Sequence, residues 1–259
     1  MRLLLVVFAG LAGAFWAAGV LGAEQVAVYR AEGSDVRLFE QYDNDGYSLE
    51  IAPNPDGSVE LKVRVSDAPL QSRAPFPVAS PISDGTLPPA PDRDLFAQQR
   101  VEGSRTQAEA VRRLLLAVAS EVSYDPDRVR LQDPAAVFSS RRAYCVGFAE
   151  LAVDLLRRIG IAARTVQGVL RTGTDDPAFD PAIGGAYHRW IEVYYPDRGY
   201  VFSDPRLSVN GVDARYIPFS MRALTRPRTL HVSAETISGE LRYEPVQAGE
   251  TKVRVRATR

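Results

Sequence analysis

The segment at residues 142–156 constrains the fold most, because an amphipathic helix there begins at the only cysteine of the chain. Apolar residues recur at helical spacing after Cys145, and Gly160 predicts the C-terminal end of the helix. The apolar positions are Phe148, Ala149, Ala152, Leu155, Leu156 and Ile159. A thiol at a helix N-terminus lies at the positive end of the helix dipole, which favours the thiolate. Arg141 and Arg142 add positive charge, so the pattern predicts a reactive thiol, with a small buried cysteine as the alternative.

The sequence after Gly160 changes from helical spacing to strand patterns. We predict strands at 161–170, 188–195 and 200–204, with a hairpin turn at 196–199 between the second and the third. Helices followed by an antiparallel sheet indicate the α+β class.

Two side chains of this predicted hairpin suit the chemistry of a thiol. His188 begins one strand and Asp204 ends the next, and their midpoint, residue 196, falls at the turn, so they should lie within reach of each other. A histidine can take the thiol proton, and an aspartate can orient the imidazole, as in a nucleophilic triad. The alternatives are a structural histidine and a turn aspartate before Pro205. His231 lacks such neighbours and is expected to be structural or at the surface.

The composition excludes some classes of function. The 259 residues carry 31 basic and 32 acidic side chains, for a formal net charge of −1, and both signs are interspersed. We therefore expect no nucleic-acid partner. One cysteine and two distant histidines offer no zinc spacing, so we expect no metal and no cofactor.

Residues 1–23 are typical of a secretory signal peptide. Arg2 precedes an uncharged apolar run, and small residues stand before Glu24, so cleavage is expected after Gly22 or Ala23. The run is also long enough to span a bilayer, so an uncleaved anchor is the alternative and the only membrane contact expected. We predict an exported protein, periplasmic or secreted, in which a lone unpaired cysteine is notable because such compartments are oxidising.

Residues 24–67 are expected to form a small β module. Short runs of alternating apolar and polar residues predict antiparallel strands, with Asn/Asp-Gly turns between them. The runs lie at 26–29, 36–39, 47–51 and 59–65. The C-terminal segment 221–259 is expected to be a further β extension, with strand-like runs at 229–232 and 252–256.

A proline-rich stretch at 68–95 is expected to link this module to the rest of the chain. Few contacts should cross such a linker, so the module should be separable, with proteolysis first between Val78 and Asp94. A capping box at 106–109 then predicts a helix, whereas 133–144 shows no strong period.

Four linked motifs make residues 105–210 similar to the transglutaminase-like superfamily, within the papain-like cysteine-enzyme fold. They lie at 144–151, 155–164, 188–193 and 199–205, in the order that such proteins show. The resemblance implies a domain at 96–220 in which a helical half packs on an antiparallel sheet. It also implies that Cys145, His188 and Asp204 form a catalytic triad.

The chain departs from these relatives at two positions. Tyr144 stands before the cysteine, where relatives commonly have glycine or another small residue. Eukaryotic transglutaminases use a tryptophan upstream of the cysteine as an oxyanion donor, but the only tryptophan after residue 23 is Trp190, in the histidine motif. The backbone N–H of Cys145 can supply one donor, and the sequence identifies no second one.

The resemblance implies attack of a thiolate on a carbonyl to give a thioester. An amine would resolve that thioester in a cross-linking enzyme, and water would resolve it in a hydrolase or deamidase. We expect acyl transfer or amide hydrolysis on a protein or peptide substrate. The alternative is a catalytically silent binding or scaffold module of the cell envelope.

Overall fold

The computed structural model describes residues 24–245 except 67, 80–86, 224–225 and 240–243. The signal peptide predicted at 1–23 and the strand predicted at 252–256 lie outside the described residues. None of the helices in the described part of the chain has the length and apolar character that crossing a bilayer requires.

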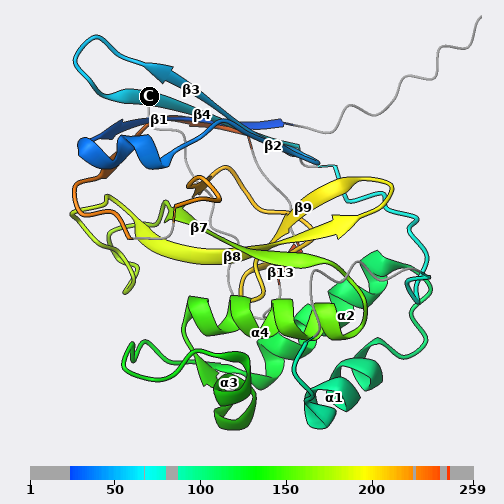
Figure 1. Cartoon of the computed structure of the whole chain (residues 1–259). Coiled ribbons are helices and arrows are strands. Elements are labelled where there is room, and N and C mark those ends of the chain that lie inside the picture. The colour runs from blue at the N-terminus through cyan, green and yellow to red at the C-terminus, as the bar shows by residue number, and fades with distance from the viewer. Residues whose placement is uncertain (1–23, 67, 80–86, 224–225, 240–243, 246–259) are drawn as a thin grey trace, which may run out of the picture.

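Two antiparallel sheets and a set of helices form three layers (Figure 1). The first sheet has the order β12-β1-β4-β3-β2 and comprises β1 (Glu24–Glu32), β2 (Tyr42–Asn44), β3 (Tyr47–Pro53), β4 (Val59–Ser66) and β12 (His231–Ser238). The second has the order β11-β7-β8-β9 and comprises β7 (Ala163–Leu170), β8 (Ala186–Tyr195), β9 (Gly199–Ser203) and β11 (Tyr216–Pro218). The class is α+β with an N-terminal β sheet, as the sequence predicted.

The helices lie below the second sheet in the view of Figure 1. They are α1 (Pro91–Val101), α2 (Gln107–Glu121), α3 (Pro134–Ser140) and α4 (Cys145–Arg158). Shorter elements are η1 (Ser34–Leu38), the parallel pair β5 (Ser123–Tyr124) with β6 (Arg142–Ala143), and the pair β10 (Ser208–Val209) with β13 (Glu244–Pro245).

The helical layer follows the sequence patterns closely. In the predicted capping box, the Thr106 hydroxyl accepts from the Glu109 N–H, and the Glu109 carboxylate accepts from the Thr106 N–H. Leu114 of α2 and Leu151 of α4 are fully buried in one core with Ile191 of the second sheet. Burial of each such side chain contributes about 1.5–3 kcal/mol, so the apolar stripes hold α2 and α4 in place.

Two local predictions were wrong, and one short helix was not predicted. Residues 36–39, predicted as a strand, fall largely in the 3₁₀ helix η1. The segment 133–144 contains α3, which Asp133 caps by accepting from two backbone N–H groups, an end signal that a search for periodicity overlooks in so short a helix. The proline-rich linker ends earlier than residue 95, because Pro91 occupies the first turn of α1, where no N–H partner is needed.

The N-terminal strands are not separated from the rest of the chain, contrary to the expectation of few contacts. The strand β12, from the segment predicted as a C-terminal extension, pairs with β1 along its length. Between the two sheets lies a single core in which Leu61 and Val63 of β4 are buried together with Trp190 of β8. The Tyr29 hydroxyl also donates to the Ala214 carbonyl at 2.8 Å. Proline content predicted a linker because it reflects the conformational preference of the backbone. It carries no information on which elements pack against each other.

Candidate active site

The helix α4 presents Cys145 at its N-terminus, with Tyr144 as the capping residue. The predicted apolar stripe is buried except for Ile159, which is half-buried, and Gly160 takes the positive φ of 81° that ends such a helix. The segment before the cysteine is held by β6, which lies parallel to β5 so that Tyr124 is the register partner of Ala143. The ladder therefore places Tyr124 beside the chain two residues before the thiol.

The structure confirms that His188 and Asp204 lie together. His188 Nε2 is 2.6 Å from Asp204 Oδ2, and both side chains are buried. The register differs from the prediction by one residue, because Ile191 pairs with Ser203, which centres the hairpin at residue 197 and not at residue 196. Contact is still made because Asp204 lies beyond the end of β9, in a turn closed by its bridge to Ser208.

Several donors hold the Asp204 carboxylate. The Tyr216 hydroxyl donates to Oδ2 at 2.8 Å, and the Arg206 backbone N–H donates to Oδ1 at 2.9 Å. Burial would raise the pKa of Asp204, but the charge and hydrogen bond of His188, with these donors, hold it below its ordinary value. Asp204 is therefore ionised and oriented. Sequence analysis missed Tyr216, which lies on β11 and has no local signal.

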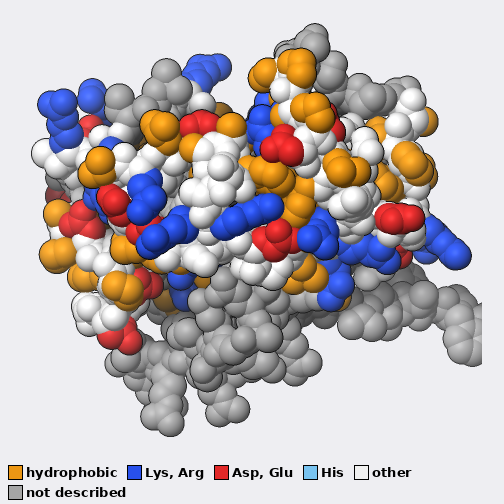
Figure 2. Space-filling view, turned by 90° about the horizontal axis from the view of Figure 1, so that it is seen from below, with side chains coloured by type: hydrophobic (Ala, Val, Ile, Leu, Met, Phe, Trp, Pro, Cys, Tyr) orange, Lys and Arg blue, Asp and Glu red, His pale blue; other side chains and the backbone are white. Residues whose placement is uncertain are grey.

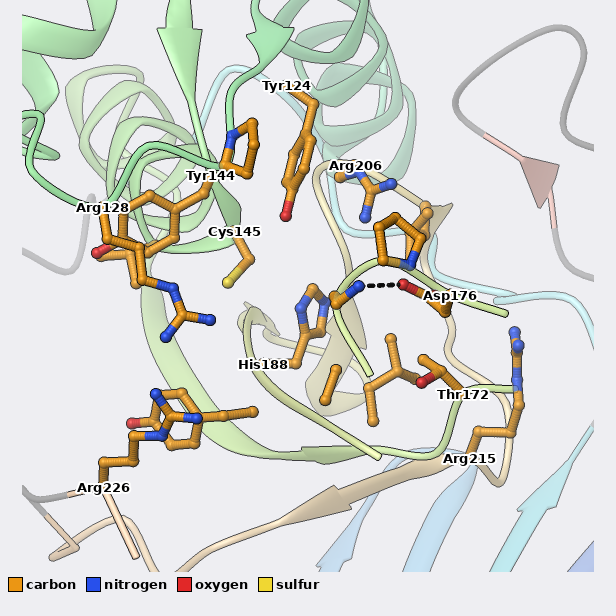
Figure 3. A pocket seen from close by; sticks show the side chains of 18 residues that line it. Tyr124, Arg128, Tyr144, Cys145, Thr172, Asp176, His188, Arg206, Arg215 and Arg226 are labelled. Atoms are coloured by element: carbon orange, nitrogen blue, oxygen red, sulfur yellow. Dashed lines mark hydrogen bonds between the residues drawn. The ribbon is translucent and has the colours of Figure 1, made fainter. Parts of the chain in front are cut away.

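Cys145 and His188 line the same cleft, and the thiol faces the imidazole (Figure 3). Because Nε2 of His188 bonds to Asp204, Nδ1 is the ring nitrogen that remains for the thiol. Burial raises the pKa of Cys145, but the His188 contacts and the Arg189 N–H lower it below its ordinary value overall. Burial likewise lowers the pKa of His188, whereas Asp204 and Cys145 raise it well above its ordinary value. The geometry favours a thiolate–imidazolium pair.

The two arginines before the helix do not act on the thiol as expected. Arg142 Nε lies 3.1 Å from Asp125 Oδ2, and Arg141 Nη1 lies 3.6 Å from Glu121 Oε2. The Arg141 guanidinium also covers the Phe138 ring at 4.2 Å. Each of the two arginines is therefore paired with a carboxylate, and these ion pairs help to hold the segment that leads into α4.

A cleft of about 660 Å³ opens over Cys145 and His188. Figure 3 shows the Tyr124 hydroxyl directed toward the Cys145–His188 pair, with Tyr144 on the other side of the thiol. The Arg206 guanidinium covers the Tyr124 ring at 4.4 Å from its centre. The cleft thus gives a substrate carbonyl access to the sulfur, with a neutral donor nearby.

The other residues considered from the sequence lie away from this cleft. Trp190 is fully buried in the core, 6.1 Å from His188 between ring centres, and does not line the cleft. His231 is exposed on β12, and its Nδ1 lies 3.4 Å from the Ala182 carbonyl oxygen. Among the described residues no group of three or more His, Cys, Asp or Glu could hold a metal ion. That the protein needs no metal or cofactor stays a prediction.

Comparison with known proteins agrees with this fold. Residues 95–205 match the sequence profile described as the transglutaminase-like superfamily. This part of the chain is therefore similar to transglutaminase-like domains, and the matched range contains Cys145, His188 and Asp204.

Individual relatives are distant. The uncharacterized protein YebA of Bacillus subtilis (strain 168) is 32% identical over 74 residues, which cover 27% of this chain and 10% of that protein. The chain thus matches about a tenth of the length of this curated relative. A candidate cysteine protease from Cytophaga hutchinsonii is 14% identical, with a TM-score of 0.46 over 88% of this chain and 91% of that one. The periplasmic domain of TgpA from Pseudomonas aeruginosa is 16% identical, with a TM-score of 0.39 over 73% and 88%.

Proposed function

We propose that the protein catalyses acyl transfer or hydrolysis at amide groups of a protein or peptide, through Cys145, His188 and Asp204. The observation that carries the proposal is the chain of contacts from the thiol to a buried carboxylate. The thiol faces the imidazole of His188 in the cleft (Figure 3), and His188 Nε2 lies 2.6 Å from Asp204 Oδ2. This is the arrangement in which a histidine can take a thiol proton and later return it.

The reaction begins when the Cys145 thiolate attacks the carbonyl carbon of an amide in the cleft. The C–N bond of the tetrahedral intermediate then breaks as the His188 imidazolium protonates the departing amine, which leaves a thioester on Cys145. Water or a second amine attacks the thioester and transfers a proton to His188. Sulfur leaves again as the thiolate.

Two groups support the developing oxyanion. The backbone N–H of Cys145 is at the first position of α4, where it has no helical partner. The Tyr124 hydroxyl is directed toward the same pair of residues (Figure 3), and burial raises the pKa of Tyr124, so that it stays a donor. We assign Tyr124 as the second donor, the role that a tryptophan plays in eukaryotic transglutaminases.

The silent-module alternative has less support. A scaffold would not need a deprotonated thiol, a buried ionised carboxylate and an open cleft in one place, because buried charges cost free energy unless they are paired. Cys145 is partly exposed and lines the cleft. Export through residues 1–23 is part of the proposal and rests on the sequence pattern.

The experiment that tests the function replaces the nucleophile. Cys145→Ala removes the sulfur and little volume, so activity against amide donors, measured with and without an added amine, should vanish while the circular dichroism spectrum is unchanged. The comparison with and without amine separates transfer from hydrolysis. Cys145→Ala activity near the wild-type level in a clean preparation would rule out this nucleophile.

A further inference from the structure

An ion pair joins α4 to β8 close to the reacting groups. Arg189 Nη1 of β8 lies 2.8 Å from Glu150 Oε1 of α4, and the two side chains are 25% and 35% exposed. Charged side chains are common at this surface, since the helical face in Figure 2 shows both signs interspersed. A partly exposed pair adds at most about 1 kcal/mol to stability. What distinguishes this pair is its position in the fold.

The pair lies one residue from the histidine and five residues from the thiol. Arg189 follows His188 on β8, and Glu150 follows Cys145 at about 7.5 Å along the axis of α4. Alternation along β8 places Arg189 on the face that packs on α4, with Ile191, whereas His188 is on the opposite face. The pair therefore connects the two elements whose separation sets how closely the sulfur approaches the imidazole.

The apolar contacts between α4 and β8 specify this separation less sharply. Leu151 of α4 and Ile191 of β8 are buried in one core, and the burial of apolar surface is a non-directional force. A charge-assisted hydrogen bond has a preferred distance and angle. The ion pair of Arg189 and Glu150 thus adds a directional contact near the end of α4 that carries the thiol.

The side chain of Arg189 is also held from β7. Gln167 is its register partner, and Gln167 Oε1 accepts from the Tyr187 hydroxyl at 2.5 Å and from Arg189 Nη2 at 3.4 Å. The amide Nε2 of Gln167 donates to the Ala223 carbonyl. The residues before and after His188 therefore share one acceptor, which ties the position of Arg189 to the strand that carries the imidazole.

We infer that Glu150 and Arg189 are positioning residues, whose ion pair holds α4 at the separation from β8 at which the thiol meets the imidazole. Neither side chain is among those that line the cleft, so the pair acts on the geometry of the site and not on the substrate. Loss of the pair lets α4 move away from β8, and the thiolate then loses stabilisation by His188. This inference rests on the proposed function, since it concerns how the same site is held.

Glu150→Gln tests the inference, because its two effects on the thiol have opposite signs. Removal of a negative charge by itself would lower the pKa of Cys145 and move the alkylation curve to lower pH. Loss of position instead weakens the contact with His188 and moves the curve to higher pH. We expect a shift of about one pH unit upward in iodoacetamide alkylation, measured from pH 5 to 10. An unchanged curve or a downward shift would overturn the inference.

Asp45→Asn is the matched control, because it removes the carboxylate of a comparable ion pair at the other end of the hairpin. Arg198 Nη2 lies 2.6 Å from Asp45 Oδ1, and the side chains are 40% and 21% exposed. This variant should keep the wild-type alkylation curve, and the thermal melts of both variants should stay close to that of the wild type. An equal shift in the control would show a general loosening and overturn the inference.

Exchange of the two charges supplies a second test, on turnover of an amide donor. Glu150→Arg and Arg189→Glu each place like charges opposite each other, so each should lower kcat by about 10- to 100-fold with little change in KM. The double variant restores a pair of opposite charges and should recover a large part of kcat. A double variant no faster than the slower single variant would overturn the inference.

The two readouts separate this inference from the proposed function. Absence of any turnover of amide donors by the wild-type protein would overturn the proposed function. The alkylation curve of Glu150→Gln would still decide the inference in that case, because alkylation needs only the thiolate and its contact with His188.

Discussion

At the scale of single residues, the state of Cys145 depends on two groups behind it. His188 lowers the pKa of the thiol, and Asp204 raises the pKa of His188, so that the pair is ionised together. Such coupled groups titrate as a unit. The rate of alkylation should stay at a plateau below pH 8.5, the ordinary region for a cysteine, and fall only as the pH drops through the lowered pKa.

Asp204→Asn should shift this curve upward in pH. The change removes the charge that keeps His188 protonated, and this outweighs the small opposite effect that Asp204 exerts directly on the thiol. His188→Ala should shift the curve further and nearly eliminate turnover. The measurement is the alkylation rate from pH 5 to 10. An unchanged curve in Asp204→Asn would show that the three residues do not act together.

Tyr124→Phe should separate alkylation from acyl transfer. Loss of one oxyanion donor lowers kcat by about 10²–10³, whereas attack on iodoacetamide develops no oxyanion and should keep its rate. Tyr194→Phe is the control, because Tyr194 lies outside the cleft, with its ring packed on Tyr200. A parallel fall of both rates in Tyr124→Phe would assign this tyrosine a structural role.

At the scale of elements, the hairpin of β7 and β8 determines where His188 lies. Gly168 is the register partner of His188, and a Cβ at this position would overlap the Ile217 carbonyl of β11 and the Trp190 ring. The absence of a side chain thus lets three strands close tightly behind the imidazole.

Gly168→Ala should destabilise the protein by about 1–3 kcal/mol, because overpacking moves backbone and side chains from their best positions. Chemical denaturation measures the loss, and the alkylation rate reports whether His188 has moved. Gly211→Ala is the control, since a Cβ there meets nothing within 4 Å. Equal stability of the two variants would contradict the close packing of β7 against β11.

At the scale of the whole molecule, the two sheets act as one body. The β1 strand pairs with β4 on one side and with β12 on the other, so strands about 200 residues apart in the chain lie next to each other. The Tyr47 hydroxyl also donates to the Tyr216 carbonyl at 2.7 Å, which connects the first sheet to the strand that orders Asp204.

Proteolysis between Val78 and Asp94 should therefore leave two fragments that stay together. The shared core and the β1–β12 pairing should keep them in one peak on gel filtration under native conditions, with alkylation of Cys145 retained. Only denaturant should separate them. Fragments that elute apart without denaturant would support the separable module predicted from the linker.

Local sequence patterns predicted most of the elements around the site and the residues that meet there. Helical spacing located α4, turn residues located the hairpin, and the order of Cys145, His188 and Asp204 predicted the pairing that the structure contains. These features are local because propensity, capping and turn geometry act over a few residues. His188 and Asp204 are in contact even though the predicted register of the hairpin was wrong.

The groups that surround the thiol depend on contacts between distant parts of the chain. Tyr124 and Tyr216 come from short strands without a pattern of their own, and Arg141 and Arg142 are occupied by carboxylates that no local spacing predicts. The pairing of β1 with β12 in one sheet is likewise not predicted by any local pattern. Such contacts join residues far apart in the chain, and their free energy comes from burial and pairing that exist only once the chain has folded.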